Sequence, residues 1–186
     1  RARIAAVGAG RMGRGIAQIF AYAGHEVALI DVKPRGPGEA ARLLRAAQAE
    51  IAGNLAFLGE LGVLSAAQAE AVLARIETHE ETGADAAMAA ADVLFEGVRE
   101  RLDAKAPVLR RMGAAARLEA ILASTTSTMQ VDELARLTGR PQRFLNAHFL
   151  NPAYLIPLVE VSAGAATEDA VREAMLDLLR AAGKKP

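Results

Sequence analysis

The chain has 186 residues, and 52% of them are hydrophobic, which is enough to bury one well-packed core. Twenty-two Lys and Arg residues balance 22 Asp and Glu residues, so the charge gives no support to a nucleic-acid partner. The chain has no cysteine, which excludes disulfides, a thiolate zinc site and a cysteine nucleophile, and we expect no metal site. No apolar run approaches the ~20 residues that a membrane span needs, so we expect a cytoplasmic protein without a membrane partner.

The N-terminal part has the pattern of a strand, a helix and a second strand. An apolar run at Ile4–Val7 predicts a buried strand, and apolar residues at helical spacing predict a helix over Met12–Tyr22. A second apolar run, Val27–Ile30, predicts another buried strand. Strand, glycine turn, helix and strand within about thirty residues form a βαβ unit, which is right-handed almost without exception.

Two long helical stretches follow a break at Gly36–Gly38. They cover about Glu39–Leu61 and Ser65–Arg75, with Ser65 as the expected N-cap. We interpret this pair, about residues 39–75, as an insertion relative to a minimal Rossmann crossover. Two roles remain open for it: a helical hairpin packed on the sheet, or a lid or substrate surface formed by its exposed face.

Strands and helices alternate again after the helical pair. Asp132 is expected to cap a short helix that ends at Gly139, and Thr167 is expected to start the last helix. We therefore predict one α/β domain over residues 1–186, with a Rossmann-like doubly wound sheet and room for antiparallel pairing among the later strands. The remaining predicted elements are a helix over Arg99–Arg117 and strands at Val93–Phe95, Ala120–Ala123, Phe144–Phe149 and Leu158–Val161.

The segment between the first strand and the first helix matches the pattern G-x-G-x-x-G. It consists of Gly8, Ala9, Gly10, Arg11, Met12 and Gly13. In this pattern the first glycine permits a tight turn, the second lets a pyrophosphate approach the backbone, and the third lets helix and strand pack closely. The helix that begins near Arg11 directs its free amides at the phosphates. The string alone is weak evidence, but here it follows a strand and opens a helix.

An acid stands at the end of the second strand. Asp31 lies twenty-one residues beyond Gly10, where its carboxylate can accept hydrogen bonds from the adenosine ribose hydroxyls. Its charge repels a 2′-phosphate, so NAD is favoured over NADP, although Lys33 and Arg35 lie close by and can weaken this preference. A glycine turn that binds no ligand is the less favoured alternative.

The second half of the chain combines His148, Asn151 and Glu160 within thirteen residues. A strand, a reversing loop and a second strand place His148 and Glu160 side by side on neighbouring strands. A carboxylate beside an imidazole raises its basicity and fixes its orientation, which suits a general acid/base. The other histidines, His25 and His79, are predicted to be structural or surface residues.

Four stretches carry a family resemblance in their order and spacing: GAGRMGRGIAQIFAYAGHEVALID, ADVLFEGVRERLDAK, ILASTTST and NAHFLNPAYLIPLVEV. Together they resemble the L-3-hydroxyacyl-CoA dehydrogenase family, and the resemblance runs from Arg1 to Pro186. The His-Phe-x-Asn-Pro string, with a glutamate twelve residues after the histidine, is far more specific than the glycine loop. The resemblance implies oxidation of an L-3-hydroxyacyl-CoA to the 3-ketoacyl-CoA with NAD as cofactor.

The resemblance also implies catalytic roles for four residues. His148 would remove the proton from the substrate 3-hydroxyl, and Glu160 would stabilise the imidazolium that forms. Ser127 would hydrogen-bond the substrate oxygen and lie near the nicotinamide. Asn151 would help to hold the same region.

Two further residues, Glu100 and Lys105, match positions that contact the cofactor in the family. Solvated charges on a helix are an equally favoured alternative for them. The expected cofactor-binding set is Gly8, Ala9, Gly10, Arg11, Met12, Gly13, Asp31, Glu100, Lys105, Ser127 and Asn151.

The sequence departs from the family at a few positions. Thr125 replaces the usual Asn of S-N-T-S and has no amide donor, so contacts around the nicotinamide or substrate are expected to differ. Leu150 replaces the usual second Phe, a mild change in an apolar wall. Tyr154–Pro157 also resembles the lambda-crystallin and gulonate dehydrogenase branch, which keeps the His-Glu pair. A dehydrogenase of a CoA-free 3-hydroxy acid, such as gulonate or carnitine, is therefore an alternative, and a non-catalytic NAD-binding structural module is an alternative of another class.

An all-helical second domain normally follows this region in the family. It supplies most of the dimer interface, a further substrate-contacting Asn and much of the acyl pocket. Because the chain starts without Met and stops at Pro186, we expect it to be a piece of a longer, homodimeric protein without that domain. The piece alone is expected to bind NAD but to turn over its substrate poorly.

Overall fold

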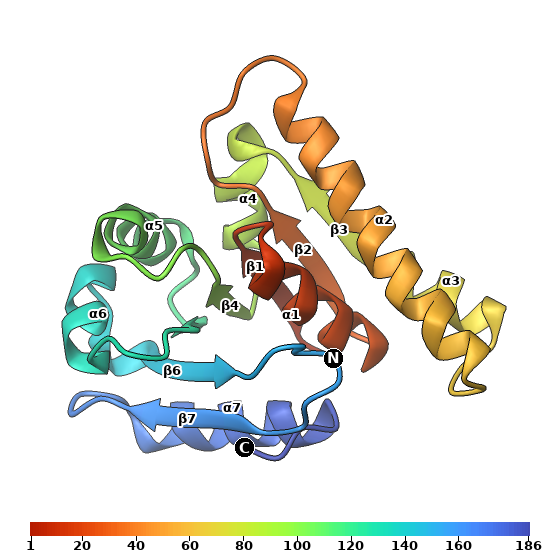
Figure 1. The fold of residues 1–186 in the computed structure, drawn as a ribbon. Helices are drawn as coiled ribbons and strands as arrows, with labels where there is room; N and C mark the ends of the chain where they lie inside the picture. Colours follow the sequence, from red (N-terminus) through yellow and green to blue (C-terminus); the bar gives the residue numbers. More distant parts are fainter.

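A computed structural model describes all residues from Arg1 to Pro186. Seven strands form one sheet in the order β3-β2-β1-β4-β5-β6-β7 (Figure 1). All neighbouring strands are parallel except β6 and β7, which are antiparallel. The strands are β1 Arg3–Val7, β2 Glu26–Ile30, β3 Ile76–His79, β4 Val93–Glu96, β5 Ile121–Ser124, β6 Phe144–Phe149 and β7 Val159–Ala163. The order 3-2-1-4-5-6 is that of a doubly wound dinucleotide-binding sheet, which confirms the predicted fold class.

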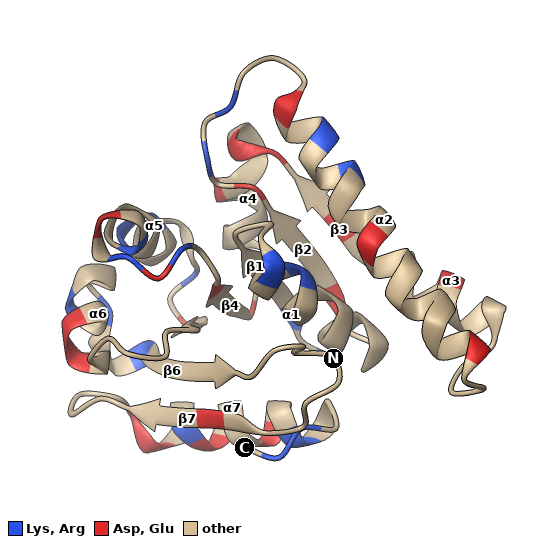
Figure 2. Cartoon of the chain, in the orientation of Figure 1, with Lys and Arg blue, Asp and Glu red and all other residues tan.

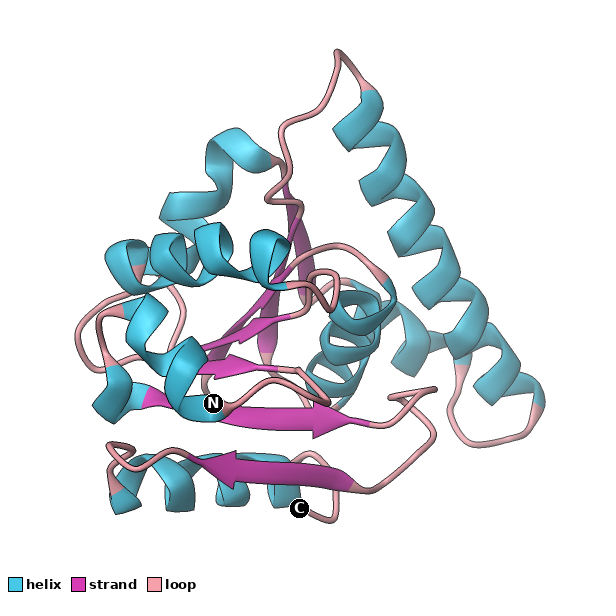
Figure 3. Cartoon of the chain, turned by 60° about the vertical axis from the view of Figure 1, so that its left-hand side comes forward, coloured by secondary structure: helices cyan, strands magenta, loops and turns pink.

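Seven α-helices cover the two faces of this sheet (Figure 3). Helices α1, α2 and α7 contribute to the core on one face, and α4, α5 and α6 contribute to the core on the other. None of the helices combines the length and the apolarity that crossing a bilayer requires. The helices are α1 Arg11–Tyr22, α2 Glu39–Glu60, α3 Ala66–Leu73, α4 Ala84–Ala89, α5 Leu102–Ala115, α6 Val131–Thr138 and α7 Asp169–Ala181.

The first strand shows how the short apolar runs build both cores. Side chains alternate along a strand, so Ile4 and Ala6 of β1 face one cluster while Ala5 and Val7 face the other. All four are buried, as expected for a parallel strand covered on both sides. The apolar run without polar alternation is therefore the sequence pattern of a central strand.

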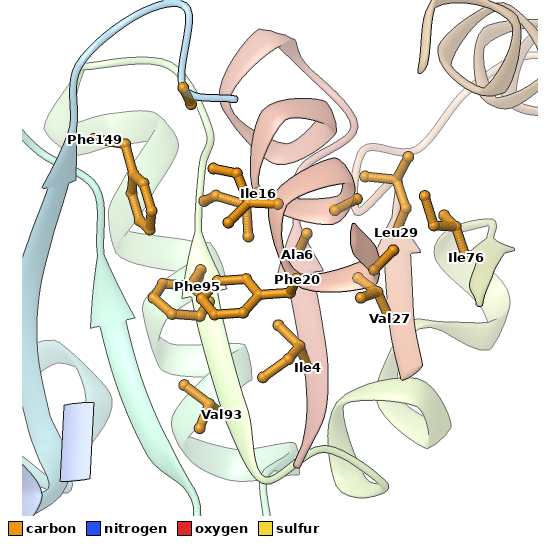
Figure 4. Packing of buried hydrophobic residues seen from close by; sticks show 14 of the residues in the cluster. Ile4, Ala6, Ile16, Phe20, Val27, Leu29, Ile76, Val93, Phe95 and Phe149 are labelled. Carbon is orange, nitrogen blue, oxygen red and sulfur yellow. The ribbon is translucent and has the colours of Figure 1, made fainter. Parts of the chain in front are cut away.

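Aromatic rings join the two halves of the sheet on the first face. The rings of Phe20 and Phe95 stack with centroids 5.1 Å apart, and Phe95 meets Phe149 edge to face at 5.8 Å (Figure 4). Such pairs contribute about 0.5–1.5 kcal/mol each beyond the area they bury. These contacts fix β6, which carries Phe149, against the centre of the sheet.

The helical pair at residues 39–75 corresponds to α2 and α3. Together they form the crossover from β2 to its parallel neighbour β3, and α2 is long enough to extend well beyond the sheet (Figure 1). Four residues of α2 are buried in the first core: Leu44, Ala47, Ile51 and Leu55. Ser65 caps α3 as predicted, in a capping box with Gln68. Val72 of α3 is buried in the same core, whereas Phe57 of α2 is 51% exposed. A lid or substrate surface formed by the exposed face stays a prediction.

Some local predictions were wrong. The sequence pattern predicts no element between Ile76 and Asp92, whereas the structure has β3 and α4 there. Asp132 does not cap α6; it lies in the first turn and accepts a hydrogen bond from the amide of Ala165 at 2.8 Å. Thr167 precedes the true N-cap of α7, because its hydroxyl donates to the carbonyl of Phe144 at 2.7 Å instead. In both cases a tertiary partner competes with the local cap.

Candidate functional site

The predicted site residues gather at the carboxyl ends of the parallel strands. The glycine loop follows β1, Asp31 follows β2, Glu100 follows β4, and Ser127 follows β5. Strand order reverses between β1 and β4, since β2 leads away on one side and β5 on the other. Ligands of open α/β sheets bind in the crevice at this reversal.

Two glycines of the loop are required by the packing of the chain itself. Gly8 has φ +113°, a conformation that L side chains rarely adopt. A Cβ at Gly13 would overlap the carbonyl oxygen of Gly8, so α1 can approach β1 only with glycine at this position. Ala9, between them, is buried, and Arg11 and Met12 open α1 with their side chains exposed and half-buried.

Gly10 is different, because nothing within the chain requires a glycine there. Its backbone is extended, with φ −79° and ψ −172°, which any residue can adopt. A Cβ added at Gly10 would have only one neighbour, the carbonyl oxygen of Gly97 at 3.9 Å. The open space above Gly10 fits a ligand that needs to approach the backbone, as the pyrophosphate of a dinucleotide does. Gly10 also serves as N-cap of α1 without a side-chain hydrogen bond, so the first turn keeps free amides for an anion.

Asp31 lies where the acid of a dinucleotide site is expected, and its carboxylate is already engaged. It is 3% exposed. Arg35 donates to both carboxylate oxygens, from Nε at 2.5 Å and from Nη2 at 3.3 Å. Arg35 also donates to Glu39 at 3.1 Å. The hydrogen bond to Asp31 raises the pKa of Arg35 against the opposing effect of desolvation.

A buried ion pair lies beneath the second half of the site. Lys105 of α5 and Glu96 at the end of β4 have no exposed side-chain surface, and Nζ lies 2.9 and 3.0 Å from the two carboxylate oxygens. Glu96 also accepts the hydroxyl of Ser124 at 2.6 Å and the amide of Val98 at 2.7 Å. Lys105 reaches outward as well, to Glu100 at 3.1 Å. Contact of Lys105 with the cofactor stays a prediction, since its ammonium group faces these carboxylates.

Glu100 connects this pair to the turn that carries Ser127. Its carboxylate accepts the hydroxyl of Thr126 and the amide of Ser127, the latter at 2.9 Å. Partial burial alone would raise the pKa of Glu100, but these hydrogen bonds and Lys105 together lower it to about 2. Glu100 is therefore a carboxylate at neutral pH and fixes the backbone of Ser127, whose side chain is exposed.

Asn146 supports the same turn from the neighbouring strand. It is 8% exposed, and its Nδ2 donates to the carbonyl of Thr126 at 2.9 Å. Its Oδ1 is buried without a partner. Asn146 thus supplies an amide donor to the turn that contains Thr125 and Thr126.

His148 and Glu160 are opposed across the antiparallel pair of β6 and β7. His148 Nδ1 lies 2.8 Å from Glu160 Oε2, as the predicted side-by-side arrangement requires. The imidazole is 19% exposed and the carboxylate side chain is 62% exposed. Because Nδ1 is engaged by the carboxylate, Nε2 remains available to exchange a proton with a ligand.

Asn151 begins the loop between these two strands and is exposed, with no hydrogen bond from its side chain to another residue of the chain. The loop itself is held from two sides. Ala153 approaches Gly15 of α1 so closely that a Cβ at Gly15 would lie 2.9 Å from that of Ala153. The ammonium of Lys184 donates to the carbonyls of Ala153 and Ile156 at 2.6 and 3.0 Å. Burial lowers the pKa of Lys184.

Three residues of this site, Glu96, Asn146 and Lys184, were not predicted from the sequence. Glu96 ends β4 directly after the apolar residues Val93–Phe95, much as Asp31 follows the apolar residues of β2, so the same pattern indicates it. Asn146 lies two residues before His148, on the same face of β6, and this spacing is also visible in the sequence. Lys184 has no such signal, because only the folded chain brings it to the loop.

Comparisons with known proteins identify the family of the chain. Residues 3–186 match the family model described as 3-hydroxyacyl-CoA dehydrogenase, NAD binding domain. A 3-hydroxybutyryl-CoA dehydrogenase of Bradyrhizobium diazoefficiens is 36% identical over 98% of this chain and 59% of its own length. The human mitochondrial hydroxyacyl-coenzyme A dehydrogenase is 32% identical over 98% of this chain and 57% of its own length.

Solved structures show the same likeness. The crystal structure of (S)-3-hydroxybutyryl-CoA dehydrogenase from Ralstonia eutropha superposes with a TM-score of 0.90 at 32% identity, over 99% of this chain and 62% of that one. The chain thus spans about three fifths of the length of these relatives. The predicted recognition and fold are confirmed: the chain belongs to the 3-hydroxyacyl-CoA dehydrogenase family and corresponds to its NAD-binding domain.

Proposed function

We propose that the protein oxidises the 3-hydroxyl group of an L-3-hydroxyacyl-CoA to the 3-ketone, with NAD as cofactor. The observation that carries this proposal is the opposition of His148 and Glu160, with Nδ1 and Oε2 2.8 Å apart. An imidazole oriented by a carboxylate is the arrangement that general acid/base catalysis needs. Relatives that share this chain's fold carry the names 3-hydroxybutyryl-CoA and hydroxyacyl-coenzyme A dehydrogenase.

In this proposal His148 takes the proton of the 3-hydroxyl on Nε2. The imidazolium that forms is stabilised by Glu160, which accepts the Nδ1 proton as a hydrogen bond. The Ser127 hydroxyl, exposed on a turn whose backbone is fixed by Glu100, donates to the substrate oxygen. Asn151, exposed at the start of the β6–β7 loop, helps to hold the same region.

The proposed NAD site extends along the strand ends. Gly10 leaves room for the pyrophosphate, while Gly8 and Gly13 permit the tight turn and the close packing of α1 on β1. Asp31 would face the adenosine ribose. In a doubly wound sheet, the second half of a bound dinucleotide would be held by β4, β5 and β6, so Ser127 and His148 would be the residues nearest the nicotinamide. When bound, NAD accepts the two electrons and the hydrogen that leave the carbinol carbon.

The substrate class is tested by comparing two kinds of 3-hydroxy compound. The full-length protein is incubated with NAD and either (S)-3-hydroxybutyryl-CoA or a CoA-free acid, gulonate or carnitine, and NADH formation is followed. The proposal predicts a kcat/KM at least about 10²-fold higher for the CoA thioester, since distant contacts contribute to transition-state binding. A higher kcat/KM for a CoA-free acid would replace the proposed substrate, and no turnover of either would favour a structural NAD-binding module.

The proposal includes a homodimer, which the family resemblance implies, and a cytoplasmic location, which is an expectation from the sequence. Dimerisation would depend on the helical domain that the family resemblance implies. Sedimentation of the full-length protein tests this part: a monomer at micromolar concentration would contradict it. Residues 1–186 alone are expected to bind NAD and to turn over the thioester poorly.

A further inference from the structure

The carboxylate that is expected to read the adenosine ribose does not stand alone in this chain. Asp31 is bound by Arg35 through two guanidinium nitrogens, from a loop that connects β2 to α2. We propose that Arg35 makes the adenosine site accept NADP as well as NAD, and is thus the residue that sets this specificity. The proposal depends on the adenosine ribose lying at Asp31, as in the proposed function.

The ion pair with Arg35 compensates the negative charge of Asp31. An unpaired carboxylate at the end of β2 discriminates against NADP because it repels the 2′-phosphate. Here Asp31 is 3% exposed, and the cation of Arg35 lies 2.5 Å from Oδ2, so the negative charge is compensated where the phosphate would arrive. In a weakly solvated site, such compensation acts strongly. The repulsion that normally excludes NADP is therefore weakened.

Arg35 also has N–H donors that no residue of the chain uses. A guanidinium has five N–H donors. Two are used by Asp31 and one by Glu39. Two donors remain for a ligand, and a planar guanidinium suits the oxygens of a phosphate. The Arg35 side chain is 17% exposed, so it is held in place but not closed off.

Further charged residues surround the pair of Asp31 and Arg35. The loop before α2 carries Lys33 and Arg35, and the start of α2 carries Glu39 and then Arg42 (Figure 2). Glu39 is the one acid besides Asp31 that contacts Arg35, and its side chain is 45% exposed. Lys33 is exposed and places a second cation two residues from Asp31. The site therefore has three cationic side chains, Lys33, Arg35 and Arg42, against the two carboxylates of Asp31 and Glu39. This balance favours a phosphate.

The carboxylate also keeps its capacity to bind NAD. An ionised carboxylate has about four lone-pair sites, and Arg35 occupies one on each oxygen. The amide of Lys33 approaches Oδ1 only at 3.5 Å. Asp31 therefore has acceptor sites left for the ribose hydroxyls of NAD, whereas the donors of Arg35 serve the phosphate of NADP. One ion pair thus offers partners to both cofactors.

The proposal is tested by calorimetric titration of the purified full-length protein with NAD⁺ and with NADP⁺. Three variants are compared with the wild type. Arg35→Gln removes the positive charge, and Arg35→Lys keeps the charge without the planar guanidinium. Arg45→Gln is a charge-matched control on the exposed surface of α2. Circular dichroism confirms that each variant is folded. A second titration series at raised salt measures the electrostatic part of each affinity.

The expected ratio Kd(NADP⁺)/Kd(NAD⁺) is below about 30 in the wild type, because one charge-assisted contact offsets the residual repulsion. Arg35→Gln is expected to raise this ratio at least about 20-fold. Arg35→Lys should give an intermediate ratio, because lysine keeps the charge but lacks the paired hydrogen bonds of a planar guanidinium. Arg45→Gln leaves the ratio within about twofold. The affinity for NADP⁺ is expected to fall more steeply with salt than that for NAD⁺.

Two results would overturn the proposal. A wild-type ratio above about 10³ would show that NADP⁺ is excluded in spite of Arg35. An unchanged ratio in Arg35→Gln would remove Arg35 as the cause of the specificity, and if both cofactors are weakened equally in that variant, Arg35 contacts the part of adenosine that they share. Failure to bind NAD⁺ at all would overturn the dinucleotide site of the proposed function, while cofactor binding without turnover would overturn only the dehydrogenase proposal.

Discussion

His148 and Glu160 lie directly opposite each other on β6 and β7, with Nδ1 2.8 Å from Oε2. The antiparallel turn of the chain is what creates this relationship, because the two residues are twelve positions apart in sequence. The strands before β6 are all parallel and connect through helices. The change of direction at β6 therefore places the acid beside the histidine rather than at the far end of the sheet.

Replacing Glu160 by Gln should lower kcat about 10–10²-fold, because the amide keeps the hydrogen bond but no longer offsets the charge of the imidazolium. The KM for NAD⁺ should stay within about twofold, since the proposed role of Glu160 is limited to His148. Steady-state kinetics of the full-length protein measure both values. Glu173→Gln, an exposed acid of α7, is the matched control. A kcat of Glu160→Gln within twofold of the wild type would contradict the role of Glu160.

Ala substitutions at Gly10 and Gly13 should separate binding from folding. At Gly13 the new Cβ overlaps the Gly8 carbonyl, so Gly13→Ala should lower the free energy of unfolding by at least about 2 kcal/mol. At Gly10 the new Cβ has free space, so Gly10→Ala should cost less than about 1 kcal/mol. Gly10→Ala should nevertheless weaken NAD⁺ binding at least about tenfold, or ~1.4 kcal/mol. Urea unfolding and calorimetry test this, and unimpaired NAD⁺ binding by Gly10→Ala would refute the assigned role of Gly10.

The buried pair of Lys105 and Glu96 should show strong coupling. Lys105→Met leaves the carboxylate of Glu96 buried without its cation and should lower the free energy of unfolding by about 3–5 kcal/mol. The double variant Glu96→Gln/Lys105→Met should be more stable than the sum of the single changes by at least about 1 kcal/mol, because it removes the uncompensated charge. Urea denaturation of the four proteins measures the coupling. Additive effects would mean that the pair contributes nothing as a pair.

The low pKa of Glu100 predicts a specific dependence of stability on pH. The carboxylate titrates near 4.5 when unfolded and at about 2 when folded, so its contribution is complete above pH 4.5 and is lost as the pH falls towards 2. Glu100→Gln can still accept from Thr126 and Ser127 but does not titrate. The free energy of unfolding should therefore fall less steeply in Glu100→Gln than in the wild type from pH 5 downwards. Parallel curves would contradict the assigned hydrogen bonds.

Much of the fold could be predicted from the sequence because its central strands are short apolar runs. Val27–Ile30 and Phe144–Phe149 were located in this way, and β2 and β6 cover them. β3 was missed because its sequence, Ile-Glu-Thr-His, is polar after the first residue, as suits an edge strand with one partner. α4 was missed because it has six residues, four of them Ala, which give no periodicity.

The sequence predicted those site residues that lie at or directly after the ends of strands. The juxtaposition of His148 and Glu160 was predicted from two strands and a reversing loop, and the structure has it, while their roles stay a prediction. The environment of Lys105 was not predictable, since a charged residue on a helix is normally exposed and only Glu96 explains its burial. Likewise, proximity in sequence indicated Arg35 near Asp31, but not that it binds both carboxylate oxygens.

The central claim is that His148 is the base of a dehydrogenase, and single-turnover and steady-state assays of His148→Gln test it most directly. The full-length protein is supplied with NAD⁺ and (S)-3-hydroxybutyryl-CoA, and NADH formation is measured beside His79→Gln as the histidine control. The account predicts that His148→Gln loses at least about 10²-fold in kcat while its Kd for NAD⁺ stays within about twofold. His79→Gln should match the wild type. Undiminished turnover by His148→Gln, with normal NAD⁺ binding, would contradict the account.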